Sequence, residues 1–169
     1  MSFLSKIYAK TQELNMLNTE AIYDWLEKNS QDSLDNDKDL LDELITKYQD
    51  KFREVQRKTS ILIYRAIKLK SVKDLNYKRL GMHWSFEESG AQVCGGGDYM
   101  GKEEHNGKTY TLVGETHPNN VDWEYGLISF LGYGEDQWEC ALKSGSKVNI
   151  KAIKDSKKIL ENPNKIGTV

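Results

Sequence analysis

The sequence predicts an α+β protein in which helices come first and strands follow. In the first 58 residues, apolar residues recur at helical spacing. From residue 59 onward, β-branched residues become frequent and apolar residues alternate with polar ones. We therefore expect a single domain, residues 1–169, with a helical layer over 1–58, a β-rich core over 59–154 and a frayed tail over 155–169.

Two helices are expected before residue 58. Asn18 is a suitable N-cap for the segment 19–29, which has acidic residues in its first turn, and the polar segment 31–39 then forms a connector. The next helix ends near Lys58 and carries an amphipathic stripe. Its apolar positions are Leu40, Leu41, Leu44, Ile45, Tyr48, Phe52 and Val55. We interpret the stripe as core packing and assign it no cofactor.

The strands are expected from residue 59 onward. In the segment 59–70, Ile61, Ile63, Arg65 and Ile67 share one face, and Leu62, Tyr64 and Ala66 share the other. Further along, the pattern predicts a strand over 82–86, a short helix over 87–93, a hairpin over 103–116 turning at Asn106-Gly107, a strand over 121–132 and a last strand through Val148, Ile150 and Ala152. The sequence contains no visible internal repeat or domain linker.

A carboxylate lies within the strand predicted around residues 137–142. Alternation places Gln137, Glu139 and Ala141 on one face and Trp138, Cys140 and Leu142 on the other. A strand with one solvated face would account for the position of Glu139 without any function. A functional site on that face is the alternative.

Two earlier segments also carry polar side chains. Arg65 lies in a strand whose faces are otherwise apolar, so its guanidinium needs an anionic partner or a path to solvent. His83, Trp84 and Ser85 share one short strand, with His83 and Ser85 on a common face. His83 is either a general base or a satisfied structural histidine.

Charge and cysteine content narrow the classes of function. The chain has 24 Lys and Arg against 26 Asp and Glu, yet residues 50–80 contain ten basic residues and three acidic ones. This segment is either a surface for a phosphate-bearing ligand or nucleic acid, or a solvated helix face. Cys94 and Cys140 lack metal-ligand spacing, so no metal is expected. Without a long apolar run or a signal segment, we expect a cytoplasmic protein with no membrane partner.

Three segments, in this order, resemble the mono-ADP-ribosyltransferases of the Arg/Ser/Glu class. They are YRAI with Arg65, the strand of Ser85 followed by a helix with Ala91, and the Q-x-E of Gln137 and Glu139 running on as CALKSGSKVNIKAI. The resemblance covers residues 60–153. The family's second motif is Ser-Thr-Ser and here reads His-Trp-Ser, which leaves open whether His83 or Ser85 orients Glu139.

The resemblance implies a fold and a set of roles. The fold would be N-terminal helices packed on a mixed two-sheet β core that is the catalytic part of the chain. NAD would be the substrate, with Glu139, Gln137 and Ser85 as catalytic residues. The residues expected to bind NAD are Arg65, His83, Trp84 and Tyr133.

The same resemblance implies transfer of ADP-ribose to a cytoplasmic macromolecule. A protein is the expected acceptor, nucleic acid is the second option, and phage-encoded members suggest a target in a bacterial host. Glutamine at position 137 goes with acceptors other than arginine in this family. Two other functions remain open: a non-enzymatic binding or inhibitor protein acting through the basic surface at 50–80, and an NAD glycohydrolase.

Overall fold

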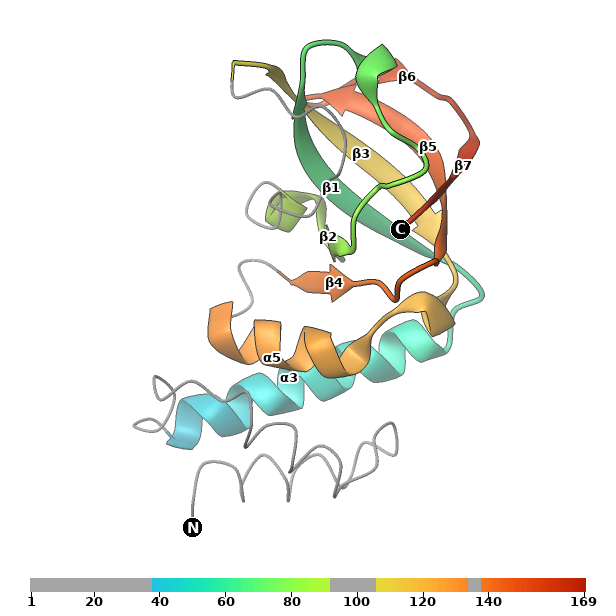
Figure 1. Cartoon of the computed structure of the whole chain (residues 1–169). Coiled ribbons are helices and arrows are strands. Elements are labelled where there is room, and N and C mark those ends of the chain that lie inside the picture. The colour runs from blue at the N-terminus through green and yellow to red at the C-terminus, as the bar shows by residue number, and fades with distance from the viewer. Residues whose placement is uncertain (1–37, 92–105, 134–137) are drawn as a thin grey trace. The chain divides into compact units, whose positions relative to one another are not determined.

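The computed structural model describes residues 38–91, 106–133 and 138–169, which divide into two compact units (Figure 1). The helical unit contains α3 (Lys38–Gln56) and α5 (Trp123–Tyr133). The β unit contains all the strands and three 3-10 helices, η3 (Val72–Asp74), η4 (Glu88–Gly90) and η5 (Pro118–Asn120). The α+β class is confirmed. Packing of N-terminal helices on the core stays a prediction, and the helix capped by Asn18 lies outside the described residues.

Aromatic contacts hold the helical unit together. Tyr48 of α3 donates a hydrogen bond from its hydroxyl to the carbonyl oxygen of Trp123 at 2.7 Å, and both residues are buried. The ring of Phe52 meets that of Trp123 edge to face, with centroids 4.9 Å apart. The amphipathic stripe expected in α3 is confirmed as packing, since Leu44 and Val55 are also buried. Neither described helix combines the length and apolar character that crossing a membrane requires.

The strand expected over residues 121–132 is wrong, because α5 occupies 123–133. A continuous apolar run has no clear period, so it fits a fully buried strand as well as a buried helix. Here Trp123, Leu127 and Phe130 are all buried, at the helical spacing of three and four residues. The prediction failed because the apolar side chains leave little polar face to reveal the helical period.

The β unit is built on one antiparallel sheet of seven strands. The strands are β1 (Ile61–Leu69), β2 (His83–Ser85), β3 (Lys108–Thr116), β4 (Glu139–Ala141), β5 (Lys147–Asp155), β6 (Lys158–Glu161) and β7 (Lys165–Thr168). Their order is β4-β2-β1-β3-β5-β6, with β7 also paired to β5. The expected mixed two-sheet core is therefore wrong for the described strands, which form a single sheet with antiparallel pairs throughout.

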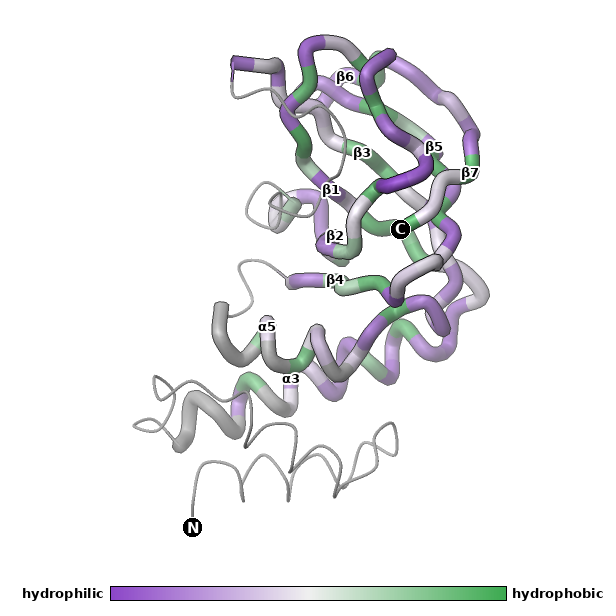
Figure 2. The backbone as a smooth tube through the Cα atoms, viewed as in Figure 1, coloured by the Kyte–Doolittle hydropathy of each residue, from purple (hydrophilic) through white to green (hydrophobic). Residues whose placement is uncertain are grey.

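One face of this sheet forms the core of the β unit. Gly114 marks its centre, because a Cβ atom there would lie 2.5 Å from Val148 Cγ1, 3.1 Å from Trp84 Cζ3 and 3.4 Å from Ile63 Cγ1. Figure 2 shows hydrophobic residues along the middle of β3 and β5. We call the side that carries Ile63 and Trp84 the core face. The strand predictions for 59–70 and 82–86 are confirmed by β1 and β2.

The C-terminal residues, expected to fray after residue 154, form two further strands. β7 pairs with β5, with Val148 opposite Gly167. On its other side, Leu80 N donates to Thr168 O at 2.9 Å and Thr168 N donates to Tyr77 O at 2.8 Å. The expectation failed because backbone hydrogen bonds fix β7, and its polar side chains give no sign of them.

Gly167→Ala should destabilise the protein. The added Cβ would lie 2.5 Å from Leu80 Cδ1 and 2.7 Å from the backbone oxygen of Tyr77, and the backbone has little room to yield. We expect a loss of about 2 kcal/mol in the free energy of unfolding, measured by urea denaturation. Ile166→Ala is the matched control, because Ile166 is 67% exposed and should change stability by less than about 0.5 kcal/mol. Equal stability of the Gly167→Ala variant and wild type would show that β7 does not dock in this way.

A candidate active site on β2 and β4

The short antiparallel pair of β2 and β4 brings together two of the predicted catalytic residues, Ser85 and Glu139, with His83 beside them. Ser85 lies directly opposite Glu139, and His83 lies opposite Ala141. Residues that face each other across an antiparallel pair project to the same side of the sheet. His83, Ser85 and Glu139 therefore share one face, which we call the Glu139 face. The sequence placed His83 and Ser85 on one face of their strand, and the register adds Glu139 to it.

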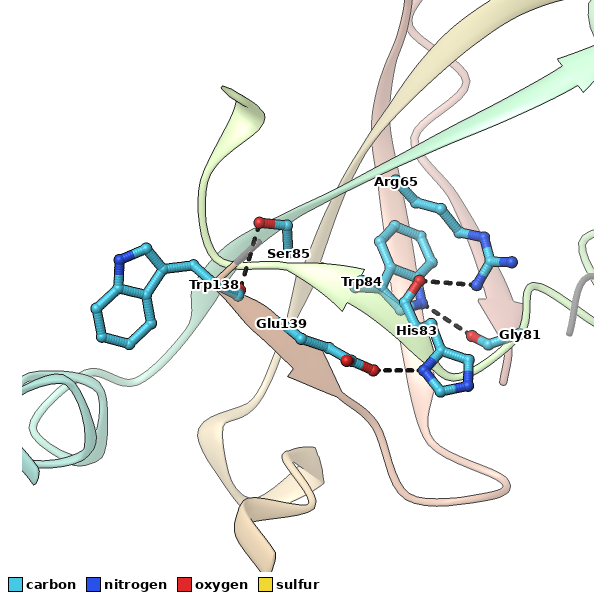
Figure 3. Close-up of polar contacts among 7 residues, drawn as sticks. All are labelled: Arg65, Gly81, His83, Trp84, Ser85, Trp138 and Glu139. Atoms are coloured by element: carbon cyan, nitrogen blue, oxygen red, sulfur yellow. Dashed lines mark hydrogen bonds and ion pairs between the residues drawn. The ribbon is translucent and has the colours of Figure 1, made fainter. Parts of the chain in front are cut away.

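His83 is the residue whose side chain holds the Glu139 carboxylate. Nδ1 of His83 is hydrogen-bonded to Oε1 of Glu139, and the two side chains point toward each other in Figure 3. The Glu139 side chain is 8% exposed and that of His83 is 24% exposed. A buried carboxylate needs such a partner, and the bond fixes the orientation of both groups. The sequence left open whether His83 or Ser85 orients Glu139, and this hydrogen bond shows that His83 does.

Ser85 acts on the backbone that leads into β4. Its hydroxyl donates to Trp138 O at 3.3 Å (Figure 3). The same hydroxyl accepts from Glu87 N at 3.1 Å. Phe86 N also donates to Trp138 O, at 2.9 Å. Trp138 has φ of 38°, a left-handed conformation that is costly for a bulky residue and persists where surrounding contacts enforce it. Nothing in the sequence signals this conformation.

Arg65 and Trp84 lie on the core face, away from the Glu139 carboxylate. Tyr64 is paired with Ser85, so its neighbour Arg65 projects to the opposite side of β1. Both Arg65 and Trp84 are fully buried. Arg65 donates from Nη1 to His83 O at 2.8 Å, and Trp84 donates from Nε1 to Gly81 O at 2.9 Å (Figure 3). These contacts fix the backbone of β2 and give both residues a structural role, whereas the NAD binding expected of them stays a prediction.

Tyr64 is a member of the site that sequence reasoning missed. It lies opposite Ser85 on one side and Val113 on the other, so Glu139, Ser85 and Tyr64 form one row across three adjacent strands. Tyr64 is partly exposed. Alternation along β1 already separated Tyr64 from Arg65, and the register of β1 with β2 was the missing information.

The remaining predicted residues cannot be placed beside this row. Gln137 lies outside the described residues. Tyr133 is the last residue of α5, in the helical unit, and its side chain lies outside the described part of the chain. Within the described residues, no three His, Cys, Asp or Glu side chains gather where they could hold a metal ion. The chemistry available on the Glu139 face is thus that of a held carboxylate, an imidazole, a hydroxyl and an aromatic ring.

Comparisons with protein-family models, curated proteins and solved structures find no match for this chain.

A double-mutant cycle should show that the contact between His83 and Glu139 contributes to the free energy of unfolding. We expect His83→Ala and Glu139→Gln each to lower the free energy of unfolding, and the double variant to lose less than their sum. The coupling should be about 1–3 kcal/mol, because the hydrogen bond involves a charged acceptor in a largely buried place. Urea denaturation of the four proteins measures it.

The ion pair of Lys154 with Glu88 provides the matched control for this cycle. Its atoms lie 3.1 Å apart, and its side chains are 21% and 43% exposed. A cycle with Lys154→Ala and Glu88→Gln should give less than about 1 kcal/mol, because solvent screens the pair. A His83–Glu139 coupling no larger than that of the control would contradict the proposed arrangement.

Proposed function

We propose that the protein is an NAD-dependent mono-ADP-ribosyltransferase whose catalytic carboxylate is Glu139. The single observation that carries the proposal is a largely buried glutamate held by a histidine on the neighbouring strand. In an ordinary solvated strand a glutamate would lie in water. A buried carboxylate fixed in orientation is what stabilisation of a developing cation requires.

The reaction would break the bond between the nicotinamide nitrogen and C1′ of the adjoining ribose. Nicotinamide leaves with the electron pair of that bond, and positive charge develops on the ribose ring as in glycoside cleavage. The Glu139 carboxylate would stabilise this charge from beside the ribose hydroxyls. A nucleophile of the acceptor then bonds to C1′ and gives up its proton, which leaves ADP-ribose attached to the acceptor.

The other residues around Glu139 would position the groups that react. His83 orients the Glu139 carboxylate, and Ser85 with Trp138 sets the start of β4. Tyr64 offers an aromatic ring against which a base of NAD can stack. In this proposal Arg65 supports β2 through His83 O instead of gripping the phosphates of NAD.

The acceptor follows from the resemblance alone. Gln137, two residues before Glu139, would contact the acceptor, which would be a cytoplasmic protein of a bacterial host modified on a residue other than arginine. Water as the acceptor would make the protein an NAD glycohydrolase. Both reactions release nicotinamide, so the fate of the ADP-ribose separates them.

Glu139→Gln should lower nicotinamide release by at least about 100-fold while the protein stays folded. The amide keeps the shape of the side chain but loses the charge that stabilises the ribose cation. The assay incubates the full chain with adenine-labelled NAD and a bacterial lysate, and it follows nicotinamide, free ADP-ribose and labelled macromolecules. Label on a macromolecule indicates transfer, and free ADP-ribose indicates hydrolysis.

Glu115→Gln is the control for this substitution. Glu115 lies on the same side of the sheet as Tyr64, two positions along from Val113 on β3, and it forms an exposed ion pair with Lys151 at 3.6 Å. Its loss should leave nicotinamide release within about twofold of wild type. Intact NAD in the wild-type reaction would overturn the proposed activity, and a wild-type rate in the Glu139→Gln variant would remove Glu139 from the mechanism.

A further inference from the structure

Lysines from separate parts of the chain gather at one end of the β unit. β1 ends beside the first residue of β3, with Leu69 opposite Lys108. The Lys108 ammonium contacts the carboxylate of Asp155, the last residue of β5. The end of β1 and the turn between β5 and β6 therefore lie at the same end of the sheet, on either side of the β3 start (Figure 1).

Five lysines at this end lack an acidic partner among the described residues. We call them the basic end; they are Lys68, Lys70, Lys73, Lys157 and Lys158, and all five are exposed. Three other lysines of the sheet, Lys108, Lys151 and Lys154, form ion pairs with Asp155, Glu115 and Glu88. The sequence itself is unbalanced here, with seven Lys and Arg against one acid in residues 58–80, and seven lysines against two acids in residues 143–169.

The basic end differs from the basic surface that the sequence predicted over residues 50–80. Arg65 is fully buried and takes no part in any surface. Lys51 and Arg53 belong to the helical unit, where they pair with Glu54 and Asp50 along α3. Only the later part of the segment contributes, and lysines from the C-terminal strands join it. The three-dimensional grouping depends on the pairing of β1, β3 and β5.

We propose that the basic end binds the phosphate backbone of a single-stranded nucleic acid, independently of the reaction assigned to Glu139. Neighbouring strands lie about 4.8 Å apart, so lysines of β1 and of the β5–β6 turn flank β3 at roughly 10 Å. That separation lets long lysine side chains reach successive phosphates of one strand. Lysine ammonium groups act as point charges, which suits contact with phosphates without base readout.

An anionic membrane suits this surface less well. Membrane attraction through charge typically uses a flexible polybasic segment or an amphipathic helix lying in the interface. The basic end is built from strand ends, a short 3-10 helix and a tight turn. We therefore commit to nucleic acid and treat the membrane as an outcome of the test.

Fluorescence anisotropy with a labelled 20-nucleotide oligouridylate tests the proposal. The full chain should bind with a dissociation constant near the micromolar range at low salt, and log Kd should rise linearly with log salt. Lys70→Ala/Lys157→Ala/Lys158→Ala should weaken binding about tenfold and lower that slope by about 2, since each phosphate contact contributes roughly 0.7.

Lys143→Ala/Lys147→Ala/Lys151→Ala removes the same charge elsewhere and is the control. All three lysines are exposed. Lys143 precedes β5, Lys147 is its first residue and Lys151 lies in its middle, whereas the basic end lies where β5 ends, at Asp155. The control should keep the wild-type slope. An equal loss in both triple variants would overturn a specific basic end, as would the absence of oligouridylate binding. Binding only to phosphatidylserine vesicles would assign the surface to a membrane instead.

Discussion

The pairing of β2 with β4 is the interaction on which the candidate site depends. Three residues of each strand face one another, and this short ladder sets Ser85 opposite Glu139. Since side chains alternate along both strands, the same ladder sends Trp84 and Cys140 into the core. A shift by one residue would bury His83 and turn Trp84 outward. The buried Arg65 restrains such a shift by donating to the carbonyl of His83.

Much of the fold follows from local patterns in the sequence. The amphipathic stripe predicts α3, and alternation predicts β1, β2 and β5, because these elements display their period in the sequence. The apolar run of α5 shows no such period, and so it was taken for a strand. The strands β6 and β7 are short and polar. Backbone pairing stabilises them, and this pairing produces no pattern in the sequence.

The candidate site is predictable only in part. The short motifs identify His83, Ser85 and Glu139, and the structure brings these three together. The register between strands far apart in the sequence decides which residues lie beside these three. Tyr64 was missed because the register of β1 with β2 was not known. For the same reason, the family resemblance grouped Arg65 with Glu139, whereas alternation from the pairing of Tyr64 with Ser85 separates them. The hydrogen bond from Ser85 to the strained Trp138 likewise has no signal in the sequence and is seen only in the three-dimensional structure.

The most direct test of an NAD site at His83 and Glu139 is a titration of the full chain, labelled with ¹³C-histidine, followed by NMR. His83 is part of the proposed site, whereas His117 caps η5 and is exposed. Substituting each histidine by glutamine in turn assigns the signals. The account predicts that the His83 ring signal shifts saturably as NAD is added, while that of His117 stays in place. A His83 signal that stays constant across the whole NAD titration would contradict it.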